Sequence, residues 1–303
     1  MTLQQIQDFL AVAQHGSLHS AARITGQTQP GLSKSLRRLE ESVGATLLLR
    51  GVKGVQLSPF GERFLVHARL IAAEADRGRS AIGEMLGEAA GVVRFGISPM
   101  SSLMMAAGAI SAFRREASNT RVQSTSGLFH TLAPMLREGQ LDFAICPSPD
   151  VEATDLSEQA LLECAVAIVG RLGHPLKRVT RLADLANANF VMGAPRGIAG
   201  SGIVAAFLRA DLPMPSIGMQ ADNLIDTLSI VSSSDRLALA PALVLKSPLL
   251  RGALEQIPIQ EPLESFRLSL ITRRGIPLPP SAKRLCTMFE REAVYLTSAR
   301  PPK

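Results

Sequence analysis

The segment from Ser17 to Arg50 has the sequence SLHSAARITGQTQPGLSKSLRRLEESVGATLLLR. Its apolar residues recur at helical spacing on both sides of Gly26, which predicts two short helices that turn against each other. Gly26 can end the first helix because glycine adopts a positive φ without strain. Thr28 can cap the second helix, and Pro30 lies in its first turn, where the missing N–H costs nothing. The segment therefore predicts a helix-turn-helix motif.

The second helix of this motif has an apolar side and a polar side. Leu32, Leu36 and Leu39 share the apolar side through i, i+4 and i+3 steps. The polar side carries Gln29, Ser33, Lys34, Arg37 and Arg38. Side chains of these types reach base edges and phosphates in protein–DNA complexes. An ordinary helical bundle with solvated cations would show the same pattern, so the neighbouring segments must decide between the two interpretations.

The segments on either side complete a larger unit. Upstream, LQQIQDFLAVAQHG has its apolar residues on one face and predicts a third helix behind the pair. Downstream, Thr46–Ser58 predicts two short strands around a Gly51–Gly54 turn, a basic wing. Residues 1–58 are therefore predicted to form an all-α winged helix-turn-helix domain that binds double-stranded DNA. The predicted DNA contacts are Thr28, Gln29, Pro30, Ser33, Lys34, Arg37 and Arg38 in the motif, and Arg50 and Lys53 in the wing.

The residues of these elements are similar to those of the LysR-type transcriptional regulators. That family typically has A-A-x-x-L in the first motif helix, followed by S-Q-P-A-L-S, R-L-E, L-F-x-R and L-T-x-A-G. The matching positions are Ala21–Ile24, Thr28–Ser33, Arg38–Glu40, Leu47–Arg50 and Leu57–Gly61. The departures are Gly31 for Ala, Leu48 for Phe, and Pro59 at the start of the next helix. Gly31 lowers helix propensity by up to ~1 kcal/mol, which loosens the free helix without changing the assignment. The close match ends near residue 65, and beyond it only layout and length agree.

Composition agrees with this interpretation. The chain of 303 residues is 46% apolar and 19% charged, enough for two or three domains with cores of their own. Its formal net charge of +6 favours a polyanionic partner. The sequence has no export signal at its start and no apolar run that could span a bilayer, so a cytoplasmic protein without a membrane partner is expected.

The cysteines predict neither a metal site nor a redox sensor. Cys146, Cys164 and Cys286 lack metal-ligand spacing, and none lies at a known interval from a histidine. One branch of the resembling family senses peroxide through two closely spaced cysteines, and no such pair occurs here. We therefore expect buried thiols and a chain that senses a molecule, with no cofactor.

From Pro59 to about Gly87 the pattern is that of one long helix. A near-heptad apolar stripe runs along it, made of Phe60, Phe64, Ala68, Ile71, Ala75, Ile82 and Met85. So narrow a stripe cannot be buried against the small N-terminal domain, and in the resembling family this helix pairs with a partner's copy. Residues 59–90 are expected to form a linker and dimerisation helix with a hinge at Gly87–Gly91. The alternative is a helix packed on the C-terminal part of the chain.

The remainder alternates strands and helices, which indicates an α/β fold. Expected strands include Val92–Ser98, Thr120–Ser126, Leu141–Pro147 and Phe266–Thr272, and the alternation restarts after Glu163–Gly170. Two lobes joined by crossing strands would resemble the periplasmic-binding-protein fold that these regulators use as a sensor. The expected domain is 91–303, with lobe I at about 91–163 and 271–303 and lobe II at about 164–270.

Ligands of such folds bind between the lobes, outside the carboxyl ends of the strands. Hydroxyls and free N–H groups gather there at helix N-termini, which favours a carboxylate or sulfonate. Phe129 and nearby methionines suggest an aromatic component. The candidate effector contacts are Ser98, Met100, Ser101, Ser102, Gly127, Phe129 and Pro147 from lobe I, and Ala194, Pro195, Arg196 and Asn223 from lobe II.

An enzyme on the same fold is the first rival interpretation. The histidines are scattered, and no catalytic triad order, paired carboxylates, nucleophile elbow or phosphate loop is evident. A solute-binding protein is the second rival, but it needs an export signal. The resemblance instead implies a ligand-responsive transcriptional regulator that binds operator DNA as a dimer, assembles into a tetramer, and has RNA polymerase as a further partner.

Overall fold

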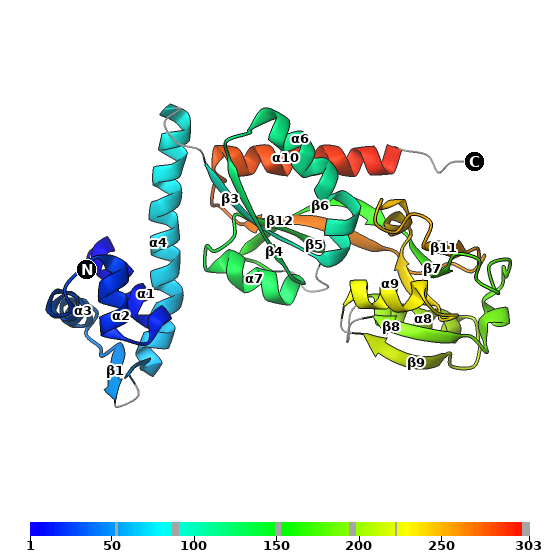
Figure 1. Ribbon diagram of the computed structural model, residues 1–303, viewed down its shortest axis with the longest axis horizontal. Coiled ribbons are helices and arrows are strands. Elements are labelled where there is room, and N and C mark those ends of the chain that lie inside the picture. The colour runs from blue at the N-terminus through cyan, green and yellow to red at the C-terminus, as the bar shows by residue number, and fades with distance from the viewer. Residues whose placement is uncertain (52–53, 87–90, 149–152, 194–197, 222, 299–303) are drawn as a thin grey trace.

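Three helices and a hairpin form the N-terminal unit in the computed structural model (Figure 1). The structure describes the chain except residues 52–53, 87–90, 149–152, 194–197, 222 and 299–303. The elements of this unit are α1 (Leu3–His15), α2 (Leu18–Thr25), α3 (Gln29–Val43), β1 (Leu48–Gly51) and β2 (Gly54–Leu57). Apolar side chains from all three helices meet in one core, as the helical spacing predicts.

The predicted boundaries of the motif helices are confirmed in atomic detail. Gly26 follows α2 with a φ of 68°, in the left-handed region that glycine adopts without strain. The Thr28 hydroxyl caps α3 by accepting a hydrogen bond from the N–H of Gly31 at 3.3 Å. Leu32, Leu36 and Leu39 are buried, so α3 packs inward through the side that the periodicity predicts.

The long helix α4 runs from Pro59 to Leu86. Phe64 packs edge-on against Phe9 of α1, with ring centroids 5.3 Å apart, and Ala68 is fully buried in the same core. The prediction that the whole stripe is withheld from the N-terminal domain is therefore wrong for these two residues, because α1 lies across the first turns of α4. The C-terminal part of the stripe stays exposed.

Lobe I is a five-stranded sheet with the order β4-β3-β5-β12-β6. Its strands are β3 (Val92–Ile97), β4 (Arg121–Ser126), β5 (Phe143–Pro147), β6 (Leu156–Cys164) and β12 (Phe266–Arg273). One continuous helical run, α5 (Pro99–Ser101), a π turn η1 (Ser102–Ala106) and α6 (Ala107–Glu116), packs with α10 (Pro280–Ser298) on one face, and α7 (Phe129–Arg137) covers the other (Figure 1). Phe95 and Phe143 stack on the first face, and Phe289 packs against both rings at an angle.

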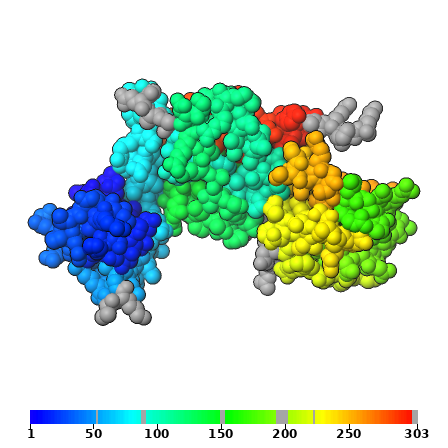
Figure 2. Space-filling model, viewed as in Figure 1, coloured from blue at the N-terminus to red at the C-terminus, as the bar shows by residue number. Residues whose placement is uncertain are grey.

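Lobe II has two smaller sheets, β10-β7-β11 and β8-β9, joined where Leu237 exchanges backbone hydrogen bonds with Asn189 and Val191. The strands are β7 (Val166–Arg171), β8 (Asn189–Gly193), β9 (Ser216–Ala221), β10 (Ala238–Pro241) and β11 (Leu254–Ile257). The helices are α8 (Ile198–Arg209), α9 (Leu224–Ser232) and the short 3₁₀ turns η2 (Leu182–Leu185) and η3 (Ala242–Lys246). Figure 2 shows the N-terminal unit, lobe I and lobe II as three successive masses.

The chain crosses between the lobes twice, from β6 to β7 and from β11 to β12. The sequence interpretation missed β11 and most of β6, since it recognised only Glu163–Gly170 in this region. Within the described part of the chain, no helix has the length and apolar character needed to cross a membrane.

Candidate DNA interface and effector cleft

The outer side of α3 presents the predicted DNA contacts to solvent. Gln29, Lys34, Arg37 and Arg38 are exposed, as are Thr28 and Pro30 at the start of the helix. Ser33 is half-buried. The helix thus combines an inner leucine side with an outer side of donors and cations, the arrangement with which a recognition helix reads a major groove.

A buried carboxylate that the sequence interpretation passed over holds α3 in place. Asp8 of α1 is fully buried and accepts hydrogen bonds from Gln4 Nε2 at 3.0 Å, Gln27 Nε2 at 2.6 Å and Ser35 Oγ at 2.5 Å. These donors come from α1, from the turn before α3 and from α3 itself. Asp8 therefore sets the position of the recognition helix relative to α1.

The wing is tied to the recognition helix at two points. The Glu40 carboxylate accepts the N–H groups of Leu47 and Leu48 at 2.7 and 3.0 Å, which anchors the start of β1. Arg50 donates from its guanidinium to Ser33 Oγ at 2.9 Å. Two predicted DNA contacts thus touch each other in the free protein. Lys53, the other predicted wing contact, lies outside the described residues.

The first loop of the predicted effector cleft is built around two serines that are completely buried. Ser98 Oγ lies 2.6 Å from Ser101 Oγ and accepts the N–H of Ser101 at 3.2 Å, so it caps α5. Ser102 is exposed and Met100 half-buried. The helix continues through a π turn at Ser102–Ala106, a geometry that often marks functional positions. Ser102 and Met100 are thus the accessible members of this group.

The other described candidates lie at the ends of neighbouring elements. Gly127, Phe129 and Pro147 of lobe I are half-buried. Asn223 is exposed and caps α9 by accepting the N–H of Asp226 at 2.9 Å. The start of α5 lies close to α9, so the two lobes approach each other here. Ala194, Pro195 and Arg196 lie outside the described residues.

Two exposed apolar side chains lie at these helix starts, and the second of them was missed from the sequence. Leu128 is 40% exposed directly before α7, and Ile225 is 50% exposed in the first turn of α9. Ligand sites combine apolar side chains with a few polar groups, and these two side chains lie beside polar helix ends. Their only sequence signal is an apolar residue in the capping region of a helix.

The cysteines are buried, as predicted. Burial raises the pKa of the Cys146 and Cys164 thiols to about 12, with smaller contributions from Glu158 and Glu163, and it also raises the pKa of Cys286. Such thiols are neutral and unreactive at physiological pH. Among the described residues, no group of His, Cys, Asp and Glu is placed to hold a metal ion.

Family models match nearly the whole chain. Residues 3–62 match the model described as "Bacterial regulatory helix-turn-helix protein, lysR family", and residues 86–293 match the model described as "LysR substrate binding domain". GbpR, an HTH-type transcriptional regulator of Azospirillum brasilense, is 26% identical over 287 residues, covering 93% of this chain and 84% of GbpR. The SDS degradation transcriptional activation protein of a Pseudomonas strain is 30% identical over 302 residues, covering 93% of this chain and 94% of that protein.

Solved structures agree on the fold. Full-length OxyR from Pseudomonas aeruginosa, in a variant form, has a TM-score of 0.69 at 20% identity, covering all of this chain and 98% of that one. Full-length CbnR in complex with its target DNA has a TM-score of 0.69 at 19% identity, covering 96% of this chain and all of CbnR. The families and relatives matched are regulators and not enzymes, which confirms the prediction from the motifs. The chain belongs to the LysR family of DNA-binding transcriptional regulators.

Proposed function

We propose that this regulator binds its operator through the outer side of α3 and the wing, and responds to a small anionic, aromatic effector held between its lobes. The single observation that carries the DNA part is the outer side of α3, where donors and cations are exposed while the leucines are buried. Gln29 would read adenine and Lys34 guanine, since these side chains match the donor and acceptor patterns of those bases in the major groove. Thr28, Pro30 and Ser33 would support this reading from the start and second turn of the helix.

Arg38, Arg50 and Lys53 would contact mostly phosphate or the minor groove. The hydrogen bond from Arg50 to Ser33 favours this role for Arg50, because it places the wing beside the recognition helix before DNA arrives. Such contacts give affinity that depends on salt and carry little sequence information.

A mobility-shift assay on the promoter next to this regulator's own gene tests the assignment. Gln29→Ala should relax preference among operator variants, with ~1–3 kcal/mol lost for each base contact. Arg38→Ala is the matched control on the same helix, and it should weaken all sequences alike and flatten the salt dependence. If Gln29→Ala discriminated between operator variants as well as the wild type does, the proposed docking would be wrong.

The effector part of the proposal is supported by the polar helix starts and apolar side chains at the lobe junction. The effector's carboxylate or sulfonate would lie near Ser102 and the N–H groups at the start of α5, because a helix N-terminus attracts anions. Its aromatic body would lie against Met100 and Phe129. Ser98 and Ser101 would act indirectly, since their hydroxyls are buried and bonded to each other.

Calorimetric titration with aromatic carboxylates and sulfonates tests this anchor. Ser102→Ala should weaken binding by removing a direct contact. Ser98→Ala should weaken binding as well, together with a loss of thermal stability from the missing cap. A site that preferred cationic or sugar ligands would contradict the proposal, as would an anion affinity unchanged by both variants.

We further propose that the protein dimerises through α4 and acts as a dimer of dimers. Phe60, Ile71, Ile82 and Met85 support this, since they are exposed and their spacings place them along one side of the helix. Two recognition helices per dimer would then require half-sites about one helical turn, ~10 bp, or a multiple of it apart.

A further inference from the structure

The linker helix α4 does not stand free of the effector domain, because Arg77 attaches it to lobe I. The guanidinium of Arg77 donates to Asp142 Oδ1 at 2.9 Å and to the carbonyl oxygens of Gly139 and Leu141 at 2.8 and 2.9 Å. The Arg77 side chain is only 12% exposed. All three partners lie in the turn between α7 and β5. One side chain of α4 therefore makes three hydrogen bonds to a single turn.

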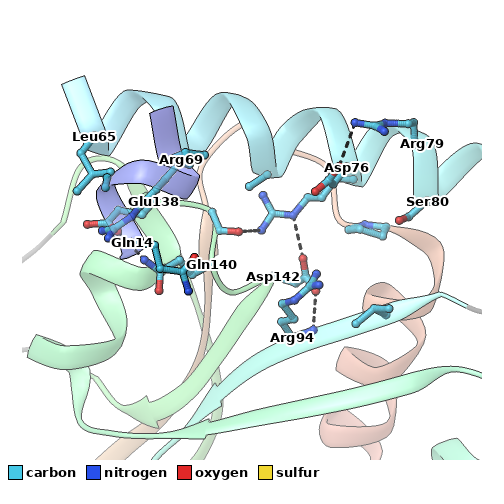
Figure 3. A pocket seen from close by; sticks show the side chains of 17 residues that line it. Gln14, Leu65, Arg69, Asp76, Arg79, Ser80, Arg94, Glu138, Gln140 and Asp142 are labelled. Atoms are coloured by element: carbon cyan, nitrogen blue, oxygen red, sulfur yellow. Dashed lines mark hydrogen bonds and ion pairs between the residues drawn. The ribbon is translucent and has the colours of Figure 1, made fainter. Parts of the chain in front are cut away.

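Asp142 connects Arg77 to the sheet of lobe I. Its side chain is 5% exposed, and its second carboxylate oxygen accepts the N–H of Arg94 on β3 at 2.8 Å. Figure 3 shows Asp142 between the linker helix and Arg94. A charge pair this deeply buried is sensitive to the removal of either partner, because the other is left without compensation.

A second connection reaches a different strand of the same sheet. Glu74 pairs with Arg77 on its own helix and with Arg273 at the end of β12, whose side chain is 10% exposed. Further along α4, Glu84 accepts the N–H and the hydroxyl of Ser281 at 2.9 and 2.7 Å, at the start of α10.

Backbone shape also favours this close approach. Gly139 has a φ of +72°, and a Cβ atom there would lie 2.8 Å from Cβ of Ala73 on α4. A side chain at this position would therefore push the helix away from the turn.

The helices of the DNA-binding unit contribute little to the attachment of α4 to lobe I. A hollow of about 770 Å³ is lined by α4, by Leu10 and Gln14 of α1 and by Glu138 and Gln140 of lobe I. Figure 3 shows Gln14, Glu138 and Gln140 at this hollow. The direction in which the DNA-binding unit points is thus fixed through α4 and its ion pairs.

We propose that Glu74, Arg77, Asp142 and Arg273 form a latch that holds the linker helix and lobe I together as one rigid body. The hinge predicted at Gly87–Gly91 lies almost entirely outside the described residues. The latch connects α4 to lobe I through other residues. While the latch is closed, the recognition helix keeps a fixed direction relative to the effector domain. When it opens, α4 keeps only its other contacts with lobe I, such as Glu84 with Ser281 and Arg69 with Glu138, and its direction can change.

The latch is placed to respond to the cleft, a consequence that rests on the proposed effector function. Strand β3 carries Arg94 near its start and leads to Ser98 at its end. Strand β12 enters lobe I from the crossing at Phe266 and ends at Arg273. Strands β3 and β12 therefore each connect the cleft to a latch contact. A change in the arrangement of the lobes would act on the latch through these two strands. An effector shifts the latch to the extent that it binds one lobe arrangement more tightly.

Pulsed electron spin resonance on the full chain measures the latch directly. Nitroxide labels are attached at Ser42→Cys on α3 and Gln123→Cys on β4, both exposed positions. The buried native thiols leave the introduced cysteines as the reactive ones. Labelled protein is mixed with an excess of unlabelled protein, so that only distances within one chain are recorded.

The wild type should give one narrow distance peak. Arg77→Ala should lose that single peak in favour of a broad or split distribution, and Glu74→Gln, which breaks the connection to Arg273, should broaden the peak to a smaller degree. Glu74→Gln protects the test against misfolding, because the Glu74 side chain is 38% exposed and its replacement leaves Arg77 and Asp142 paired. Arg79→Ala is the matched control, since it removes an exposed ion pair with Asp76 (3.1 Å) from the same helix and should keep the narrow peak.

A narrow peak that survives in both Arg77→Ala and Glu74→Gln would overturn the latch. Broadening in Arg79→Ala to the same degree would overturn it too, because any loss of charge on α4 would then loosen the helix. The measurement needs neither DNA nor effector. Its failure would leave the proposed function standing, and failure of the operator or effector tests would leave the distance result intact.

Discussion

Asp8 is a buried anion surrounded by neutral donors, with no cation in contact among the described residues. Asp8→Asn replaces one acceptor oxygen by an amide that faces donors, so a hydrogen bond to the Gln27 or Ser35 side chain is lost. The free energy of unfolding should fall by about 1–3 kcal/mol, and operator affinity should fall with it because α3 is no longer held in place. Urea unfolding and mobility shifts measure the two effects. Glu41→Gln, at an exposed acid on α3, should change neither, and an Asp8→Asn protein as stable as that control would contradict the role of Asp8.

The thiols allow a second prediction at the scale of single residues. With a pKa of about 12, the Cys146 and Cys164 thiols are almost entirely protonated at pH 8, and Cys286 is shifted in the same direction. A thiol-reactive dye should therefore label none of the three in the native protein at pH 8 and all three after denaturation. Rapid labelling of any one in the native state would show that its surroundings are open.

Single residues differ in how far their roles could be predicted from the sequence. Leu36 and Thr28 were assigned correctly because periodicity and capping depend on neighbours within a few positions. Asp8 was not, since its donors Gln27 and Ser35 are distant in sequence and a lone acid on an amphipathic helix normally faces water. Ser98 was correctly predicted to lie between a strand and the following helix, but the sequence does not reveal that its hydroxyl is used by Ser101.

At the scale of elements, α3 depends on its cap. Thr28→Ala removes the oxygen that accepts the N–H of Gly31, and the loss should lower the free energy of unfolding by about 0.5–2 kcal/mol. Thermal melting measures this effect. Thr46→Ala, at an exposed threonine before the wing, is the control, and equal melting temperatures for the two variants would show that the cap does not contribute.

Two strands were not predicted from the sequence because their local residue patterns were misleading. β6 has the sequence LSEQALLEC, which is rich in helix-forming residues, and only its pairing with β12 keeps it extended. β11 spans four residues, too few for a periodic signal. The long helix α4 was located correctly, but its apolar stripe alone does not tell which members contact α1 and which remain exposed.

At the scale of the whole molecule, the exposed members of the stripe make a prediction about assembly. Phe60 and Ile82 are 64% and 57% exposed, so replacing both with Asp should leave the fold intact and place charges in the proposed seam. Analytical ultracentrifugation should then detect species smaller than the native oligomer. Leu208→Asp, at a similarly exposed leucine on lobe II (62%), should keep the native oligomer. An unchanged oligomer in the double variant would refute the α4 interface.

Acidity should also open the latch. Burial raises the pKa of Glu74, but the hydrogen bond from Arg273 and the charges of Arg77 and Arg273 outweigh burial, so the pKa lies below its ordinary value of 4.5. Because the folded-state pKa is the lower one, this carboxylate stabilises the folded state above pH 4.5, and the contribution is lost as the pH falls through the folded-state value. The spin-label peak should thus stay narrow from pH 8 to pH 6 and broaden in acid. A peak already broad at pH 6 would contradict this.

Arg77 has a further consequence, for how the protein can change during evolution. Two of its partners are the main-chain carbonyls of Gly139 and Leu141, which every amino acid possesses. Substitutions at positions such as Gln140 therefore leave the hydrogen bonds of Arg77 to these carbonyls intact. The arginine has no such freedom, because lysine lacks the planar fork that reaches a carboxylate and two carbonyls at once. Among descendants of this gene, we expect position 140 to diverge while Arg77, Gly139 and Asp142 stay.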